Sequence, residues 1–365
     1  MRTKFHNCLT LLGLFVGVHS AFAQVTNPGI AQAGGQFVLY WPVSTTNYIV
    51  QATTNLATTN WVTATDSVPV IAVTVSNTSP ARFFRLSAVP AGMALIPAGD
   101  FTMGDTLDSV SDARPTNVYV STFYMDVNLV SLSQWQSVYS FATNQGYGFV
   151  HAGSGKAATH PVQTLDWYDC VKWSNARSQQ AGLTPVYYTD ASLTQIYTNG
   201  ELTTVYPNWA ANGYRLPTEA EWEKAARGGV AGKRFPWGNL IGQSQANYTG
   251  GTASYSYDLG PNGYNAIGSI GGTVPATSPV GSFPANGYGL YDMTGNVFEW
   301  CWDWYGTPYP GGRDPHGPAG PATYRVLRGG VWFFAASFAR CAFRNYDNPN
   351  FANPFYYGFR CVRGL

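Results

Sequence analysis

Short runs of alternating hydrophobic and polar residues dominate the chain between residues 24 and 90. These runs cover residues 36–41, 47–51, 68–75 and 81–86, and clusters of Thr, Asn, Ser and Pro separate them. Because side chains of a β-strand point alternately to its two faces, this pattern predicts short strands. We therefore predict a small all-β sandwich over residues 24–90. It holds no cluster of catalytic residue types, so we interpret it as a spacer or adhesion module.

From residue 91 onwards the pattern changes to short helical segments set among turns. It predicts helices at residues 131–139 and 166–177, and a third helix that follows a capping box of Thr218 and Glu221. The third helix also carries Glu219 and Glu223, which could suggest general acid and base carboxylates. Residues two apart on a helix diverge in direction, so capping and salt bridging is the better interpretation.

Polar residues and glycines mark the helix ends. Ser131 or Ser133 is the expected N-cap of the first helix, and Asp166 caps the second. The glycine pair Gly228–Gly229 should stop the third helix.

Strands are expected at both ends of this region. Residues 92–104 read as a strand, a turn and a second strand, and residues 324–332 as a later strand. An exposed loop should follow over residues 333–353, and residues 358–363 should form a closing strand. The region is thus predicted to be of the α+β class.

Residues 287–300 combine glycines, two carboxylates and large apolar side chains in a single stretch. We predict a wound loop, neither helix nor strand, that is buried around its apolar residues. Asp292, Glu299 and turning backbone carbonyls offer the hard oxygen ligands that calcium prefers. From these residues alone, two interpretations are equally good: a loop held together by calcium, and a tight turn whose carboxylates have hydrogen-bond partners.

Composition narrows the class of protein. The 365 residues are 45% hydrophobic, which is enough for a buried core, while only 11% are charged. Abundant Gly, Trp and Tyr favour a loop-rich fold closed by aromatic packing. The formal net charge is +1 and there is no basic cluster, which argues against nucleic acid or an anionic membrane as a partner.

The N-terminus has the features of a secretory signal peptide over residues 1–23. Arg2 and Lys4 precede an apolar run at residues 9–18, and an A-x-A cleavage site ends at Ala23. The apolar run is too short to span a bilayer. We therefore expect cleavage after Ala23 and a secreted or periplasmic protein.

Four cysteines remain after that cleavage, at positions 170, 301, 341 and 361. Four cysteines allow three pairings, and an exported protein can form disulfides. A bond between Cys170 and Cys361 would pin the C-terminus to a helix, although Cys341 could compete for the same partner. Cys301 lies among tryptophans and should be a buried thiol.

Two families resemble parts of the chain. Residues 52–56 and 83–86 are loosely similar to fibronectin-like modules appended to secreted bacterial proteins. Residues 91–365 resemble the formylglycine-generating enzyme family, also called the sulfatase-modifying factor domain. Seven motifs in order carry this second resemblance, at residues 96–104, 166–169, 214–223, 235–239, 289–300, 326–330 and 358–360.

The second resemblance implies a C-type-lectin-related α+β fold with sparse regular structure and bound calcium. It assigns calcium to side chains and carbonyls at Asp292, Gly295, Val297 and Glu299, which favours the calcium interpretation of that loop. A second family calcium site would use Asn247 and Tyr248. The family's aspartate for that site falls on Gly272 here.

The resemblance also implies an activity whose copper site is missing. Active members oxidise a substrate cysteine to formylglycine with oxygen and copper, and two soft thiolates hold Cu(I). The family's cysteine pair aligns with Phe334 and Ala339, and neither side chain can ligate copper. Cys341 aligns with a nearby structural cysteine whose family partner falls on Ala226. Cys341 is the one catalytic candidate that remains, and a single thiol does not replace the pair. The sequence therefore argues against formylglycine synthesis.

An aromatic surface is expected where the copper site would be. Trp332 and Phe359 should pack in the core, while other aromatics and an arginine should form a ligand-binding surface. The predicted ligand-binding residues are Phe333, Phe334, Phe343, Arg344, Tyr346, Phe355 and Tyr356.

Three functional hypotheses follow. The first is a calcium-stabilised module that binds a peptide, protein or glycan. The second is a copper- and oxygen-dependent oxidase that converts a sulfatase cysteine to formylglycine. The third is a variable ligand-binding protein of the lectin fold. Histidine metal motifs, a nucleophile elbow and a phosphate loop are absent from the sequence.

Overall fold

The structure is a computed structural model that describes two compact units, Met1–Ala91 and Gly92–Leu365. In the first unit it describes the backbone of six strands, and beyond them residues 89–108, 111, 113–268 and 276–365. The predicted signal peptide lies outside the described residues. No helix among those described is long and apolar enough to cross a bilayer.

The strands of the first unit form two three-stranded antiparallel sheets, in the orders β1-β2-β5 and β4-β3-β6. Four of them match the predicted runs, while β1 and β4 were not expected. The described elements agree with an all-β module, and the packing of a sandwich stays a prediction. The strands are β1 (Gly29–Ala33), β2 (Gln36–Tyr40), β3 (Tyr48–Thr53), β4 (Val62–Thr63), β5 (Ala72–Ser76) and β6 (Phe83–Ala88).

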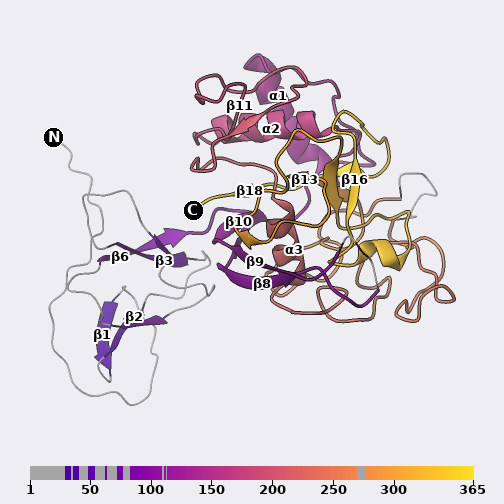
Figure 1. Ribbon diagram of the computed structural model, residues 1–365, viewed down its shortest axis with the longest axis horizontal. Coiled ribbons are helices and arrows are strands. Elements are labelled where there is room, and N and C mark those ends of the chain that lie inside the picture. The colour runs from indigo at the N-terminus through magenta and orange to yellow at the C-terminus, as the bar shows by residue number, and fades with distance from the viewer. Residues whose placement is uncertain are drawn as a thin grey trace. The chain divides into compact units, whose positions relative to one another are not determined.

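The second unit sets a few short helices among small sheets, which makes it an α+β domain with sparse regular structure (Figure 1). Its sheets have the strand orders β18-β10-β7, β14-β9-β8, β16-β15-β13-β17 and β11-β12. The helices within the described part are α1 (Leu132–Asn144), α2 (Trp167–Gln180), α3 (Glu219–Arg227) and the 3-10 helix η1 (Ala336–Ala339). The strands are β7 (Met93–Ile96), β8 (Gly99–Met103), β9 (Thr116–Val120), β10 (Phe123–Asp126), β11 (Tyr187–Tyr188), β12 (Tyr206–Pro207), β13 (Phe298–Trp304), β14 (Gly312–Arg313), β15 (Arg325–Arg328), β16 (Asn345–Asp347), β17 (Tyr357–Gly358) and β18 (Val362–Arg363).

The predicted helix starts are confirmed. The hydroxyl of Ser131 accepts a hydrogen bond from the backbone of α1, and the Asp166 carboxylate accepts one from the Asp169 backbone N–H in α2. Thr218 and Glu221 form the capping box of α3, and Gly228 ends that helix in the left-handed conformation. Local sequence signals therefore place all three α-helices of the described residues.

Helix α3 lies at the centre of the domain. All nine of its residues are buried, and it contacts β8, β9, β13 and β15. Trp222 is fully buried in a core cluster with Ile96, Met125 and Val326. The three main sheets of the domain therefore pack around one short helix, and its polar side chains must find partners inside the core.

The loop prediction for residues 287–300 is right for its first part and wrong for its end. Asp292 and Asn296 have positive φ angles of 54° and 69°, as expected for a wound loop. From Phe298 onwards, however, the chain forms β13, which pairs antiparallel with β15 and parallel with β17. This strand is central and buried on both faces, so Phe298, Glu299 and Trp300, which were expected in the loop, are core residues of a sheet.

Candidate functional site

Five aromatic rings form a contiguous group around Phe334, one of the two positions that the family resemblance assigns to copper ligands. We call this group the aromatic surface. The Phe334 ring centroid lies 5.5 Å from that of Phe333, 4.6 Å from Phe338 and 5.9 Å from Tyr356. Phe333 in turn lies 6.2 Å from Tyr264. Ring pairs at these separations attract one another beyond their simple burial.

The backbone holds these rings in place from several segments. Thr249 N–H donates a hydrogen bond to the carbonyl oxygen of Phe334, at 3.0 Å. The indole Nε1 of Trp332 donates to the carbonyl of Phe355, also at 3.0 Å, which ties the 351–357 segment to the start of the aromatic surface. Trp332 itself is only 3% exposed. The surface is therefore a built feature of the fold and does not depend on one loop alone.

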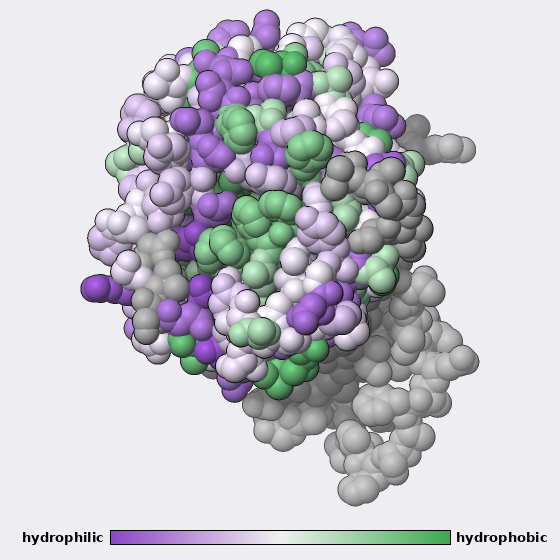
Figure 2. All heavy atoms as spheres, turned by 90° about the vertical axis from the view of Figure 1, so that its right-hand side faces the viewer, coloured by the Kyte–Doolittle hydropathy of each residue, from purple (hydrophilic) through white to green (hydrophobic). Residues whose placement is uncertain are grey.

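Part of the aromatic surface is open to solvent. Phe333 and Tyr264 are 44% and 46% exposed, and the neighbouring Phe355, whose carbonyl is bonded to Trp332, is 44% exposed. Figure 2 shows one side of the molecule, on which hydrophobic side chains gather near the middle of the visible face. Contiguous exposed aromatic groups of this kind are uncommon on soluble proteins and usually mark a contact site.

Of the other predicted ligand-binding residues, Phe343 borders the aromatic surface, whereas Tyr346 and Arg344 lie away from it. Phe343 is half-buried and packs against Phe298 and Phe338. Tyr346 is exposed, and its ring lies 4.1 Å from that of Tyr305, in a separate aromatic group. The expectation for Arg344 is wrong, since this arginine is 5% exposed and its guanidinium faces into the domain.

Sequence analysis missed Tyr264 as a member of the aromatic surface. It stands in a long loop rich in Gly, Ser and Tyr, far from residue 333 in the chain, and no local pattern joins the two.

The family resemblance aligns the copper cysteines with Phe334 and Ala339, whose side chains are a ring and a methyl group. Phe334 is part of the aromatic surface, and Ala339 ends η1 with 2% exposure. The remaining candidate, Cys341, is 1% exposed and belongs to the core cluster of Trp222 and Ala226. Burial raises the pKa of the Cys341 thiol to about 12, so it is neither accessible nor ionised near neutral pH.

The four described cysteines are all buried free thiols. The disulfide expected between Cys170 and Cys361 is not formed in the structure, and the Cys361 Sγ lies 3.5 Å from the Ser174 hydroxyl. Cys301 is a buried thiol in β13, as predicted.

The proposed calcium loop contains a carboxylate oxygen that suits a cation. Asp292 is 6% exposed, and its Oδ2 accepts a hydrogen bond from Gly281 N–H at 2.7 Å. Its Oδ1 is buried and is left without a hydrogen bond. Burial raises the pKa of Asp292 to about 6, because nothing nearby fully compensates its charge. This oxygen therefore fits a calcium ligand.

The other side chains that are predicted to bind calcium fit less well. Both carboxylate oxygens of Glu299 accept hydrogen bonds from Arg360, at 2.7 Å and 3.0 Å, so this charge is already neutralised. At the second site the Asn247 Oδ1 is buried without a partner, while the Tyr248 hydroxyl donates to Asp258. Gly272 lies outside the described residues.

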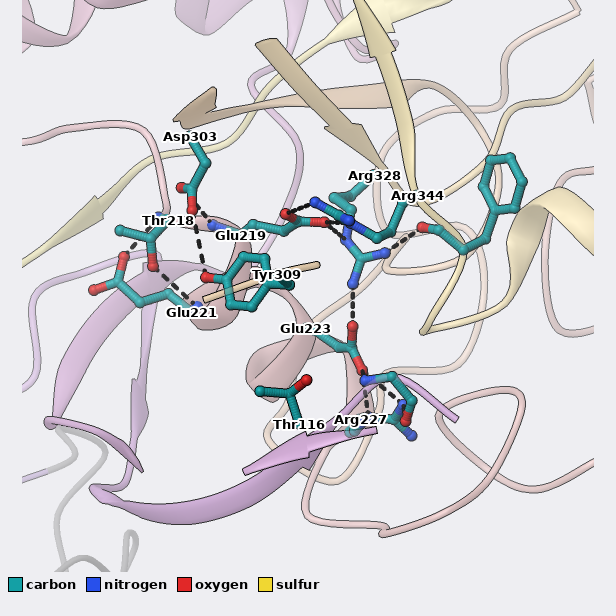
Figure 3. A network of polar contacts seen from close by, with 12 residues as sticks. Thr116, Thr218, Glu219, Glu221, Glu223, Arg227, Asp303, Tyr309, Arg328 and Arg344 are labelled. Atoms are coloured by element: carbon teal, nitrogen blue, oxygen red, sulfur yellow. Dashed lines mark hydrogen bonds and ion pairs between the residues drawn. The ribbon is translucent and has the colours of Figure 1, made fainter. Parts of the chain in front are cut away.

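The carboxylates of α3 are joined to arginines in a buried network (Figure 3). Glu219 accepts hydrogen bonds from Arg344 at 2.6 Å and 2.8 Å. Glu223 accepts from Arg227 at 2.6 Å and is ion-paired with Arg328 on β15. Each of these carboxylates is paired with an arginine inside the core. This confirms that the α3 glutamates form salt bridges.

The chain belongs to the family described as sulfatase-modifying factor enzyme 1-like domain. The model of this family matches residues 82–365. It is 33% identical over 295 residues to the formylglycine-generating enzyme of Mus musculus, covering 74% of this chain and 74% of that protein. It is 32% identical over 294 residues to the chaperone protein LppX of Paenibacillus barcinonensis, covering 77% of this chain and 97% of the relative.

Other relatives match over a smaller share of their length. The chain is 46% identical over 164 residues to the serine/threonine-protein kinase pkn1 of Chlamydia caviae, covering 44% of this chain but only 22% of that protein. Among solved structures, Treponema denticola variable protein 1 has a TM-score of 0.57 and 26% identity, covering 75% of this chain and 95% of that one. These structural relatives confirm the fold predicted from the sequence.

Proposed function

We propose that the protein is an exported, non-oxidising member of its family that binds a polypeptide through the aromatic surface. The observation that carries the proposal is the replacement of both copper ligands by Phe334 and Ala339. The first of these joins a partly exposed aromatic group, and the catalytic candidate Cys341 is buried in the core. Oxidation of a substrate at a copper site needs accessible thiolates to hold the copper, whereas aromatic side chains suit contact with a partner.

A polypeptide is the ligand class that the observations favour. The family resemblance implies that active members receive a cysteine-containing polypeptide at this place on the fold. A relative that matches over almost its whole length is named a chaperone protein. The exposed rings of Phe333 and Tyr264 can accept apolar side chains of such a segment, and burying aromatic area there supplies binding energy.

Export is proposed on the sequence alone. The charged start, the apolar run at residues 9–18 and the A-x-A site are those of a cleavable signal. Protein recovered from the exported fraction should show, by intact mass, a chain that begins at Gln24.

Display selection tests the binding proposal. Random dodecapeptides panned on the exported protein should yield binders rich in apolar residues. Their affinity should fall at least ~30-fold, or about 2 kcal/mol, in the Phe333→Ser/Tyr264→Ser double variant, because exposed aromatics act as interface anchors. Both rings are partly exposed, so thermal melting should show a folded protein.

Val150→Ser is the matched control, since Val150 is 57% exposed in the connection between α1 and α2. It should bind the selected peptides like the native protein. Equal affinity in the double variant, or selective retention on a glycan array in place of peptides, would reject the proposal. So would oxygen-dependent aldehyde formation on a cysteine-containing peptide after loading with Cu(I).

We also propose that calcium stabilises the loop around Asp292. Bound calcium would supply positive charge to a buried carboxylate, and Asp292 would hold it with the carbonyls of Gly295 and Val297, while Glu299 stays paired with Arg360. Free calcium at 100 times its Kd should raise the unfolding free energy by about 2.7 kcal/mol. The measurement is denaturant unfolding in CaCl2 and in EGTA at pH 7.5.

The Asp292→Asn variant should lose most of this calcium effect while keeping the hydrogen bond from Gly281. A second variant, Asp190→Asn, changes a half-buried carboxylate outside the calcium loop and should keep the full effect. Identical unfolding curves in CaCl2 and EGTA would contradict the calcium proposal.

A further inference from the structure

Three ligand-type side chains meet where the connection after α1 reaches the start of α2. The His151 Nδ1 lies 2.8 Å from the Asp169 Oδ2 and 3.7 Å from the Asp166 Oδ2. One donor atom of each of the three residues lies within 4.8 Å of the other two. No sequence motif predicts this group, because a turn-rich connection separates His151 from the two aspartates.

The two oxygens of Asp166 have different roles. The Asp166 Oδ1 accepts the capping hydrogen bond from Asp169 N–H at 2.6 Å. The Asp166 Oδ2 is buried and has no hydrogen bond, although the residue is 0% exposed. A buried carboxylate oxygen without a partner carries a substantial desolvation cost, and here it points at an imidazole nitrogen.

The charges of the group do not balance. Lys172 is fully buried, and its ammonium lies 3.4 Å from the Asp169 Oδ1, so it compensates one carboxylate. The second carboxylate, Asp166, has only the His151 imidazole beside it, at 3.7 Å. With a neutral imidazole, the two carboxylates and Lys172 leave one negative charge that a bound cation would neutralise.

The spacing of the three donor atoms suits a small transition-metal ion. Zinc binds nitrogen and carboxylate oxygen at about 2.0–2.2 Å, and a tetrahedral arrangement then sets donor atoms roughly 3.3 Å apart. The separations of 2.8 Å and 3.7 Å lie on either side of this value. The His151 side chain is 28% exposed, which gives an ion a way in and leaves room for a solvent ligand.

We propose that His151 Nδ1, Asp166 Oδ2 and Asp169 Oδ2 form a site for a divalent transition metal, with zinc as the best match. A nitrogen and two carboxylate oxygens are donors that zinc accepts, with water in the fourth position. The ion would take the place of the direct contact between His151 Nδ1 and the Asp169 Oδ2. The ion would lock the connection after α1 to the N-terminus of α2. The site uses none of the residues of the aromatic surface.

Zinc titration of the untagged full chain tests this site. The protein is stripped with chelator, returned to buffer with CaCl2 at pH 7.5, and titrated with ZnCl2 by calorimetry. We expect one zinc per chain with a Kd below about 10 µM. His151→Gln should weaken binding more than ~100-fold, because changes to residues that merely support a metal ligand already cost 10–100-fold.

Two further variants make the test specific. Asp166→Asn keeps the helix cap, since asparagine caps as well as aspartate, but removes the charge and should also abolish tight binding. His316→Gln removes an exposed histidine elsewhere and should bind zinc like the native chain. If Asp166→Asn fails to fold, the partly exposed His151 still provides the decisive variant. Absence of zinc binding, or equal binding by His151→Gln, would overturn the proposal.

Discussion

Replacement of Glu223 by glutamine should lower the unfolding free energy of the second unit by about 3–5 kcal/mol. Glu223 accepts hydrogen bonds from Arg227 and from Gly104 N–H, and it is ion-paired with Arg328. Arg328 is fully buried. Removing the carboxylate charge leaves buried guanidinium groups uncompensated, which costs more than the lost attraction alone.

The same carboxylate should make stability depend on acid. Burial acts against the charged form of Glu223, but Arg227 and Arg328 outweigh it and lower its pKa below the ordinary value of 4.5. The stabilisation is therefore complete above that pH and is lost as the pH falls through the lower, folded-state pKa. Guanidinium unfolding followed by tryptophan fluorescence, at pH 7 and under acid conditions, measures both effects.

Glu201→Gln is the control, because Glu201 is exposed. Its unfolding curve should match that of the native protein within about 0.5 kcal/mol. A loss of less than about 1 kcal/mol in Glu223→Gln would show that the buried network contributes little to stability.

Replacement of Gly295 by alanine should be among the most damaging single changes in the calcium loop. Gly295 has a φ of +81°, and a Cβ atom there would stand 2.2 Å from the carbonyl oxygen of Asn247. The left-handed backbone alone costs about 1–2 kcal/mol for a residue with a side chain. The backbone must also move apart, so we expect a total loss above ~4 kcal/mol.

Gly289→Ala separates the two contributions. Gly289 has nearly the same φ, +78°, but a Cβ there would meet nothing within 4 Å. Its unfolding midpoint should therefore shift only by the backbone cost. Equal losses in the two variants, measured by denaturant unfolding, would show that the close approach to Asn247 is not important.

Local signals were sufficient for the helices of the second unit. Ser131, Asp166 and the Thr218–Glu221 capping box act within one turn of the chain, so the sequence contains the whole interaction. The burial of Trp332 and Phe359 also follows from their setting among apolar neighbours. The family resemblance added what periodicity could not, namely the order of the loops and sheets.

The sequence failed where partners are distant. The inward direction of Arg344 depends on Glu219, which lies 125 residues away. Tyr264 joins the aromatic surface only through the fold, and His151 meets its aspartates only after the chain has turned back. Phe298 and the residues after it read as loop because the polar side chains of the strand, Glu299 and Asp303, are buried and have their partners far away in the chain.

The strand order β18-β10-β7 has a consequence for synthesis. Met125 on β10 pairs with Val362 on β18, so the first sheet of the second unit is completed by a strand that comes much later in the chain. A nascent chain therefore exposes an unpaired edge at β10 until β18 has been synthesised. Closing such a long-range contact is entropically slow, and loss of β18 would leave this edge open to self-association.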